Sequence, residues 1–559
     1  MLSYVAMVKD KIRALLEDSL KANGVDVKEI SLQHPINTEH GDYSTNVALV
    51  YAKQLKQNPL DLAQKIKGSI TGNELIEKVT VEKPGFINFF LSEKALLQEL
   101  QLITESNKKN LNKKTILLEY GQPNTHKTPH IGHLFSYIFG ESLARILENQ
   151  GYKIVRANYQ GDVGPHVAKC LYQVRLKKDK LEKIKTLREK IEFLQQCYQE
   201  GSKLYDEDKN VQKEIDDLNQ KIYNQDSEIT GLWNETRKYC LDFFKQFEKV
   251  LGISYEKYYF ESEVAEKGKE IVKKNIGKIF VESDGAIIFK GEKYGLHTRV
   301  FITKFGMPTY EAKDIGLNEE KSEITFDLSI VATASEQNEY YKVVTKVSEI
   351  IFPKLKDKLK HLGFGLIHLK SGKMSSRTGE IIDAFGLVDL TTEEIVKKYK
   401  IDQQLAQTIG LAAIKYSFLK SDAYKNIIFD LDKSIAREGD SGPYLLYTYV
   451  RTQSVLAKNS GIKAIDPQMT LNKEEKDILR LIYQFPEVIE AAAGRYSPHL
   501  IATYLFQLAH FFNFFYQKHP ILKADESTRR EFRLALTKAV GKTIKDGLYL
   551  LGIETVEKM

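Results

Sequence analysis

A strand, a turn and a helix that follow one another after residue 114 constrain the fold of this chain most. Thr115–Leu118 is an aliphatic run of the kind that forms a buried parallel strand, and Leu134–Leu147 carries apolar residues at helical spacing. The turn between them, Glu119–His133, contains two prolines and Gly132. Because a helix N-terminus presents unpaired N–H groups and a positive dipole end, this turn predicts a phosphate-binding site in a parallel α/β fold.

Three histidines stand in this turn, at His126, His130 and His133. Separations of four and three residues would place them on one helix face, so a metal site is one interpretation, and solvated or core histidines are another. The three cysteines of the chain have no paired spacing and no His-Glu-x-x-His occurs, so little else supports zinc. We therefore expect no structural metal.

The segment Pro123–His133 reads Pro-Asn-x-x-Lys-x-x-His-Ile-Gly-His and resembles the HIGH signature of class I aminoacyl-tRNA synthetases in its arginyl-tRNA synthetase form. The resemblance implies that His130 and His133 contact phosphate in the transition state, that His133 also touches arginine, and that Gly132 leaves room for adenine. When the carboxylate of an amino acid attacks the α-phosphate of ATP, catalysis consists mostly of positioning and charge stabilisation, without a protein nucleophile.

A second segment, Lys373-Met374-Ser375-Ser376, could by itself be a basic surface turn, but it resembles the mobile KMSKS loop of the same class. The resemblance implies that Lys373, Met374 and Ser375 bind ATP and that Lys373 lies beside the leaving pyrophosphate. Ser376 replaces the second lysine of the pattern. Arginyl enzymes often lack that lysine, and we adopt the hypothesis that Lys127 of the first motif supplies its charge, as a further ATP-binding and catalytic residue.

The stretch Gly306–Gly316 resembles a segment in which the arginyl family places a tyrosine and an aspartate in its arginine pocket. Tyr310 and Asp314 are separated by four residues, so they share a face if the segment is helical; alone, they could be an exposed pair. A planar guanidinium with five donors suits carboxylate acceptors and a flat aromatic face. The resemblance assigns three more residues to arginine: Glu119, Asn124 and Gln337. The residues after Gln337, Asn-Glu-Tyr-Tyr, lack the histidine associated with that site.

At 559 residues the chain is too long for one ordinary domain, and we expect a multidomain α/β protein. Residues 1–107 are expected to form an α+β domain with helices at Val5–Ala22 and Asn46–Lys67. Residues 108–385 should form a Rossmann-like, doubly wound parallel-sheet catalytic domain with a helical insertion at about 174–250. Residues 386–559 should form an all-α bundle. A strand at Lys153–Ala157 precedes a glycine-rich turn, in which Asp162 is either a substrate ligand or a turn residue.

The resemblance also implies contacts with tRNA at both ends of the chain. The first domain resembles the additional N-terminal domain of arginyl enzymes, and the last resembles their anticodon-binding domain. Exposed aromatic and basic side chains read unstacked bases, although the phenylalanine-rich stretch 511–516 is expected to be mainly core. The candidate tRNA-binding residues are Tyr43, Asn46, Phe86, Arg451 and Tyr516.

Composition agrees with this interpretation without proving it. The formal net charge of +7 suits a polyanion-binding protein, and no apolar run is long enough for a membrane span. We predict ATP-dependent ligation of L-arginine to tRNA(Arg) through an arginyl-adenylate, with release of AMP and pyrophosphate and with Mg²⁺ accompanying ATP. We expect a cytoplasmic monomer. The alternatives are a noncatalytic tRNA-binding relative and a nucleotidyltransferase that uses the same HIGH element.

Overall fold

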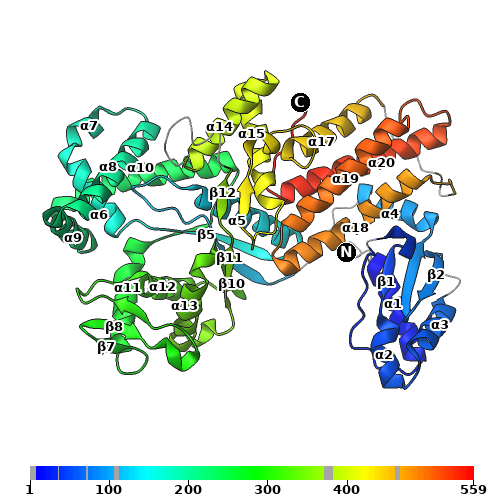
Figure 1. The fold of residues 1–559 in the computed structure, drawn as a ribbon, viewed down its shortest axis with the longest axis horizontal. Helices are drawn as coiled ribbons and strands as arrows, with labels where there is room; N and C mark the ends of the chain where they lie inside the picture. The colour runs from blue at the N-terminus through cyan, green and yellow to red at the C-terminus, as the bar shows by residue number, and fades with distance from the viewer. Residues whose placement is uncertain are drawn as a thin grey trace.

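The computed structural model describes residues 8–35, 37–70, 74–105, 112–370, 382–459, 466 and 468–559. Figure 1 shows a parallel sheet near the centre, helices α6–α10 on one side of it and the C-terminal helices on the other, with the N-terminal domain set apart below the latter. The predicted fold class, a parallel α/β catalytic unit between an N-terminal domain and a C-terminal helical domain, is confirmed. Within the described ranges, no helix is both long and apolar enough to cross a membrane.

The N-terminal domain packs helices on a small antiparallel sheet with the strand order β1-β3-β2. Its elements are α1 (Val8–Ala22), β1 (Tyr43–Thr45), α2 (Val47–Leu55), α3 (Pro59–Ile70), β2 (Ile76–Glu82), β3 (Phe86–Leu91) and α4 (Glu93–Glu105). The single helix predicted at Asn46–Lys67 was wrong, because Lys56 takes a left-handed conformation that closes α2 and Pro59 opens α3.

The central sheet has five parallel strands in the order β11-β10-β4-β5-β6. They are β4 (Thr115–Glu119), β5 (Lys153–Gln160), β6 (Lys257–Phe260), β10 (Leu328–Ala334) and β11 (Leu359–Phe364). From β4 the chain passes through α5 (Ile131–Asn149) to β5 on one side, whereas β10 pairs with β4 on the other. The strand order therefore reverses at β4, and a ligand crevice is expected at the carboxyl ends of these strands.

Three further groups of elements complete the catalytic unit. The insertion holds α6 (Pro165–Leu176), α7 (Lys178–Lys183), α8 (Leu187–Glu207), α9 (Lys209–Tyr223) and α10 (Ser227–Leu251). A small antiparallel sheet holds β7 (Val281–Ser283), β8 (Ala286–Phe289) and β9 (Arg299–Ile302). The helices α11 (Glu261–Lys274), α12 (Tyr310–Lys321) and α13 (Asn338–Ile351) follow β6, β9 and β10. At the contact of α11 with α12, a Cβ on Gly268 would lie 1.9 Å from the Ala312 carbonyl oxygen, so only glycine permits this approach.

Among its described residues, the C-terminal part contains helices and one strand, β13 (Ile427–Phe429), which pairs with β12 (Ile367–Leu369). Its helices are α14 (Ala384–Tyr399), α15 (Gln403–Leu419), α16 (Leu431–Ser434), α17 (Gly442–Leu456), α18 (Lys473–Arg495), α19 (His499–Lys518) and α20 (Ser527–Leu550). The predicted core role of the phenylalanine-rich stretch is confirmed at Phe512 and Phe515, which are fully buried, whereas Phe514 is exposed.

The end of α20 is bonded to the catalytic unit. On α5, the Ser142 hydroxyl donates to the Leu550 carbonyl over 2.8 Å, and Arg145 donates to the Tyr549 carbonyl over 3.1 Å. The buried ammonium of Lys415, on α15, donates to the Gly552 carbonyl over 2.6 Å. The helix that starts at the predicted phosphate site therefore ends against the last turn of the C-terminal bundle.

Candidate active site

A cavity of about 650 Å³ lies at the carboxyl ends of the parallel strands. Its wall includes residues within a few positions after the ends of β4, β10 and β11, Tyr159 near the end of β5, and residues of the first turn of α5. This is the crevice that the strand order predicts. It brings together most of the predicted residues of the first nucleotide motif and of the arginine pocket: Asn124, His130, Gly132, His133, Tyr310, Asp314 and Gln337.

The turn between β4 and α5 is held by hydrogen bonds to the end of β5. The Thr125 N–H donates to the Gly161 carbonyl over 2.8 Å. His126 takes a left-handed conformation, and its fully buried ring contacts the hydroxyls of Thr125 and Thr236, each over 2.8 Å. The His126 ring therefore stabilises the turn and does not line the cavity. Across the described residues, no group of three or more histidine, cysteine or acidic side chains could hold a metal ion.

The His130 and His133 rings lie against each other at the N-terminus of α5, with their centroids 3.8 Å apart and their planes tilted by 40°. The His130 backbone N–H donates to His133 Nδ1 over 3.2 Å. Since that nitrogen accepts, the neutral ring carries its hydrogen on Nε2. Burial and then the nearby Lys127 charge lower the pKa of His130; burial, His130 and Lys127 lower the pKa of His133 well below its usual value. Both rings are therefore neutral N–H donors at pH 7, at a helix end that favours anions.

Glycine is needed at position 132 for a structural reason, besides the predicted room for adenine. A Cβ at this position would lie 2.9 Å from both Cε1 and Nδ1 of the His130 ring. That distance is too short for non-bonded atoms, so a larger residue would displace the ring. Gly132 thus permits His130 to fold back over the start of α5.

Lys127 lies beside the cavity but is not one of its lining residues. Its ammonium is 5.9 Å from the ring centroid of Tyr198, which belongs to α8 of the insertion. Burial lowers the pKa of Lys127, and the Glu261 carboxylate opposes that effect. The lysine is therefore a partly desolvated charge close to the two histidines.

The second nucleotide motif lies outside the described residues. This applies to all three ATP-binding residues predicted in it: Lys373, Met374 and Ser375. The described site therefore contains the first motif and the arginine-pocket residues only.

Asp314 and Tyr310 lie in the first turns of α12, as their spacing predicts, and both line the cavity. Asp314 is 8% exposed, and one of its oxygens accepts from the Tyr340 hydroxyl over 2.7 Å. Burial raises the pKa of Asp314 to about 7; the Tyr340 hydrogen bond and the Lys321 charge oppose this rise, and the Glu119 carboxylate adds to it. The Tyr310 ring is 56% exposed and offers the cavity a flat aromatic surface.

Glu119 does not line the active-site cavity but lies next to Asp314, which does. Its carboxylate is 2.5 Å from the Lys321 ammonium and accepts from the Gln122 amide over 2.6 Å. It lines a narrow space that it shares with Asp314 and Tyr341, and it is fully buried. The structure therefore places Glu119 where it balances the charge of Lys321 and acts on Asp314 through space.

Asp162 does not line the cavity. It is fully buried, and its carboxylate accepts from Arg237 Nε over 2.6 Å and from the Ser262 N–H and hydroxyl over 2.8 and 2.7 Å. These bonds connect β5 to α10 and to the start of α11. Of the two roles considered for Asp162, the structure favours the structural one.

Several wall residues were missed from the sequence: Tyr159, Glu261, Arg299, Tyr340 and Tyr341. Only the last two had a signal, since they follow Gln337 in the segment that lacks the expected histidine. Tyr340 lies where α13 faces Asp314 and bonds to its carboxylate. The others come from segments without a motif, and only the fold brings them to the cavity.

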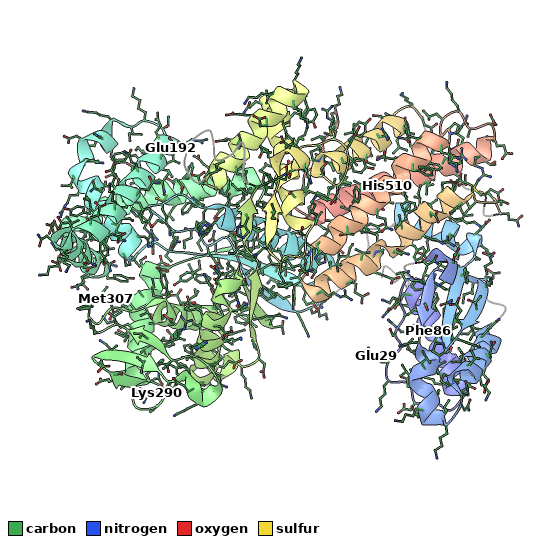
Figure 2. All side chains as sticks on the ribbon, in the orientation of Figure 1. Glu29, Phe86, Glu192, Lys290, Met307 and His510 are labelled. Atoms are coloured by element: carbon green, nitrogen blue, oxygen red, sulfur yellow. The ribbon has the colours of Figure 1, made fainter. Side chains whose placement is uncertain are left out.

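The predicted tRNA residues of the N-terminal domain divide into two groups. Tyr43 has no exposed surface, and its hydroxyl donates to Glu487 of α18, so its prediction as a tRNA contact was wrong. Asn46 and Phe86 line a surface cavity of about 380 Å³. Phe86 is 40% exposed and lies on the N-terminal domain (Figure 2).

In the C-terminal domain, the Arg451 guanidinium lies between two tyrosine rings, 4.8 Å from the centroid of Tyr447 and 4.8 Å from that of Tyr516. The Asn513 side chain and the Tyr447 hydroxyl accept hydrogen bonds from Arg451. Tyr447 and Tyr516 are each more than a third exposed. This cluster is a planar, cationic surface of the type that stacks with bases.

Comparison with known proteins identifies three segments of the chain. Residues 93–431 match the family model described as the catalytic domain of class I (R) tRNA synthetases. Residues 445–559 match the DALR anticodon binding domain, and residues 6–91 match the arginyl tRNA synthetase N terminal domain. The predicted limits of 107 and 385 remain our own division of the chain.

Relatives and solved structures are similar over nearly the whole length. The arginine–tRNA ligase of Fusobacterium nucleatum is 32% identical, over 96% of each chain, and that of Borreliella afzelii is 30% identical, over 99% of each. The arginyl-tRNA synthetase structure from Thermus thermophilus has a TM-score of 0.82 at 23% identity and covers 99% of this chain and 100% of that one. The structure from Plasmodium falciparum has a TM-score of 0.79 at 22% identity, with complete coverage of both chains.

Proposed function

Because this chain belongs to the arginyl-tRNA synthetase family, a member of class I, we propose that its described cavity binds ATP and arginine side by side. The protein is an arginine–tRNA ligase that uses ATP to join L-arginine to its tRNA. One observation carries the proposed assignment of residues. The adjacent rings of His130 and His133 at a helix N-terminus and the Tyr310–Asp314 pair of α12 line the same cavity.

The histidines serve the nucleotide. Their neutral rings and the N–H groups of the first turn of α5 donate to the phosphates, where negative charge grows as pyrophosphate leaves. Lys127 adds a positive charge next to them, and Lys373, Met374 and Ser375 hold the triphosphate from the other motif. Mg²⁺ accompanies ATP and neutralises its phosphates.

The Tyr310–Asp314 pair serves arginine. The carboxylate of Asp314, which Tyr340 holds in place, accepts hydrogen bonds from the guanidinium, and the Tyr310 ring covers the flat face of the guanidinium. Asn124, Gln337 and His133 supply polar contacts to the rest of the amino acid. Glu119 supports Asp314 from behind instead of touching the substrate.

The reaction then has two steps. The arginine carboxylate attacks the α-phosphate of ATP, which releases pyrophosphate and leaves arginyl-adenylate. A terminal ribose hydroxyl of the tRNA, the 2′-hydroxyl by the habit of the class, attacks the activated carbonyl and releases AMP. Asn46 and Phe86 in the N-terminal domain, and Arg451 and Tyr516 in the C-terminal domain, contact the tRNA. The monomeric state and the cytoplasmic location remain predictions.

Arginine-dependent exchange of pyrophosphate into ATP tests this proposal, and it should be measured with and without tRNA. His130→Ala removes one charge-assisted donor and should lower the exchange rate by about ten- to a hundredfold. His510→Ala is the matched control, since this histidine lies on α19 among the C-terminal helices (Figure 2) and does not line the cavity. A His130→Ala rate equal to that of the wild type would contradict the assignment. A wild-type chain without exchange under either condition would indicate the noncatalytic relative.

A further inference from the structure

Tyr159 is the penultimate residue of β5, and its phenol has no hydrogen-bond partner in the part of the chain that the structure describes. Its ring is partly exposed, but its hydroxyl oxygen is buried and makes no hydrogen bond with any described residue. Tyr159 is one of the residues that line the active-site cavity. Because buried hydroxyl groups are nearly always hydrogen-bonded, an unpaired one in a cavity wall points to a ligand that completes it.

The surroundings of this hydroxyl are acidic. The carboxylates that act most strongly on Tyr159 are those of Glu261, Asp314, Glu119 and Asp162, in that order. With burial, they hold the pKa of the phenol well above its usual value, so it stays protonated.

Each of these carboxylates already has a protein partner. Glu261 pairs with Lys313, Glu119 with Lys321 and Asp162 with Arg237. Asp314 accepts from Tyr340. Within the described part of the protein, each of these carboxylates thus has a cation or a hydrogen-bond donor as its partner. The Tyr159 phenol oxygen that lies among them has no hydrogen-bond partner there.

We infer that the Tyr159 hydroxyl is a ligand of the substrate guanidinium, accepting one of its N–H groups inside the cavity. This inference rests on the proposed function. A guanidinium carries five donors and no acceptor, so its full recognition needs several acceptors besides Asp314. A phenol oxygen is a neutral acceptor, and it adds a hydrogen bond without adding another negative charge to an acidic wall. Tyr159 is therefore a specificity-determining residue for arginine.

The neighbouring strand provides a matched control. Tyr259 on β6 is the register partner of Tyr159 on β5. Its hydroxyl oxygen is also buried without a hydrogen-bond partner among the described residues. Both rings pack on the same apolar cluster, which includes Leu317 and Phe326. Only Tyr159 lines the cavity, so Tyr259→Phe removes the same atom from the same environment outside the site.

The test compares Tyr159→Phe and Tyr259→Phe in the full chain, with saturating tRNA in the pyrophosphate-exchange assay. Tyr159→Phe should raise the arginine KM by about ten- to a hundredfold, the effect of removing a hydrogen bond to a charged group. The ATP KM and kcat should stay within about twofold, and Tyr259→Phe should change none of the three. A structural defect would raise both KM values, so their ratio separates the two explanations.

Three results would overturn the inference: an arginine KM for Tyr159→Phe within twofold of the wild type, an equal increase in Tyr259→Phe, or a rise confined to the ATP KM. If the wild type showed no exchange, the proposed function would fail independently. Calorimetric titration of the wild type and Tyr159→Phe with arginine would then decide. Weaker binding in Tyr159→Phe would support the inference, and equal or absent binding in both would refute it.

Discussion

Arginine binding should depend on pH through Asp314. The pKa of this carboxyl is raised to about 7, and a guanidinium binds its ionised form. Binding is therefore strong above pH 7 and weakens as the pH falls through 7. With a pKa of about 7, roughly nine-tenths of the groups are ionised at pH 8 and roughly one-tenth at pH 6. The arginine KM should therefore be about tenfold higher at pH 6 than at pH 8.

The perturbation that isolates this effect is Tyr340→Phe. The Tyr340 hydroxyl stabilises the ionised carboxylate, so its hydrogen bond lowers the pKa of Asp314 against the larger effect of burial. Removing the hydroxyl should move the midpoint of the KM profile to higher pH and raise the KM at pH 7. Tyr340→Phe keeps the ring that packs beside Tyr341. A shift of the midpoint would therefore report the lost hydrogen bond and not a loss of packing.

Other titrating groups around Asp314 must be separated from it. Lys321 and Glu119 form a buried ion pair on one side of it, and Glu261 has a raised pKa of its own. Burial lowers the pKa of both His130 and His133 below the usual histidine value, which favours their neutral forms.

The assay is pyrophosphate exchange at saturating ATP and tRNA, with the arginine KM measured at half-unit pH intervals. Asp314→Asn is the control, because an amide in place of the carboxyl should weaken arginine binding at every pH and flatten the profile. The reasoning is refuted if the wild-type KM is constant between pH 6 and 8. An unchanged midpoint in Tyr340→Phe would equally refute it.

Three further substitutions test the proposed nucleotide-binding residues by the same exchange assay. Lys127→Ala and Lys373→Ala should each lower the exchange rate by about ten- to a hundredfold, because each removes a charge-assisted contact. Near wild-type turnover in Lys127→Ala would show that this lysine does not replace the lysine that is absent at Ser376. Gly132→Ala should lower the rate by about three- to tenfold, because the new Cβ would lie 2.9 Å from the His130 ring and force it off its rotamer, at roughly 0.5–1.5 kcal/mol. A fully active Gly132→Ala enzyme with an unchanged melting temperature would contradict that interpretation.

Local patterns in the sequence located the parts of the fold that depend on local interactions. The strand before the HIGH turn, the helix after it and the helix that begins at Tyr310 were all predictable from hydrophobic spacing or motif. The helix break at Lys56 was missed because apolar spacing continues through it, although Asn58-Pro59 marks it. Strand β5 runs to Gln160, beyond the predicted end at Ala157, because its polar last residues are buried at the carboxyl end of the sheet.

The remaining site residues depend on contacts between distant segments. Tyr43 was predicted to contact RNA, but α18 buries it against Glu487, which is 444 residues away in the sequence. Glu261, Arg299 and Tyr159 reach the cavity from separate elements, and no spacing rule connects them. Motifs therefore predicted the groups closest to the chemistry, whereas the groups that orient and support them required the structure.

The bonds between α5 and the end of α20 limit how this protein can be divided for engineering. Family models separate the chain between residues 431 and 445, which suggests that a catalytic fragment could be expressed alone. Such a fragment would keep Ser142, Arg145 and Lys415 but lose the carbonyl groups of residues 549–552 that accept from them. Ser142 is fully buried and would lose the acceptor of its hydroxyl, and a buried donor left without its acceptor costs about 1–3 kcal/mol. Lys415 would keep the Leu251 carbonyl as an acceptor, and Arg145 would keep Glu141 and the Gly252 carbonyl. A catalytic fragment would therefore be stabilised by an apolar replacement at Ser142, or by the last turn of α20 supplied as a separate peptide.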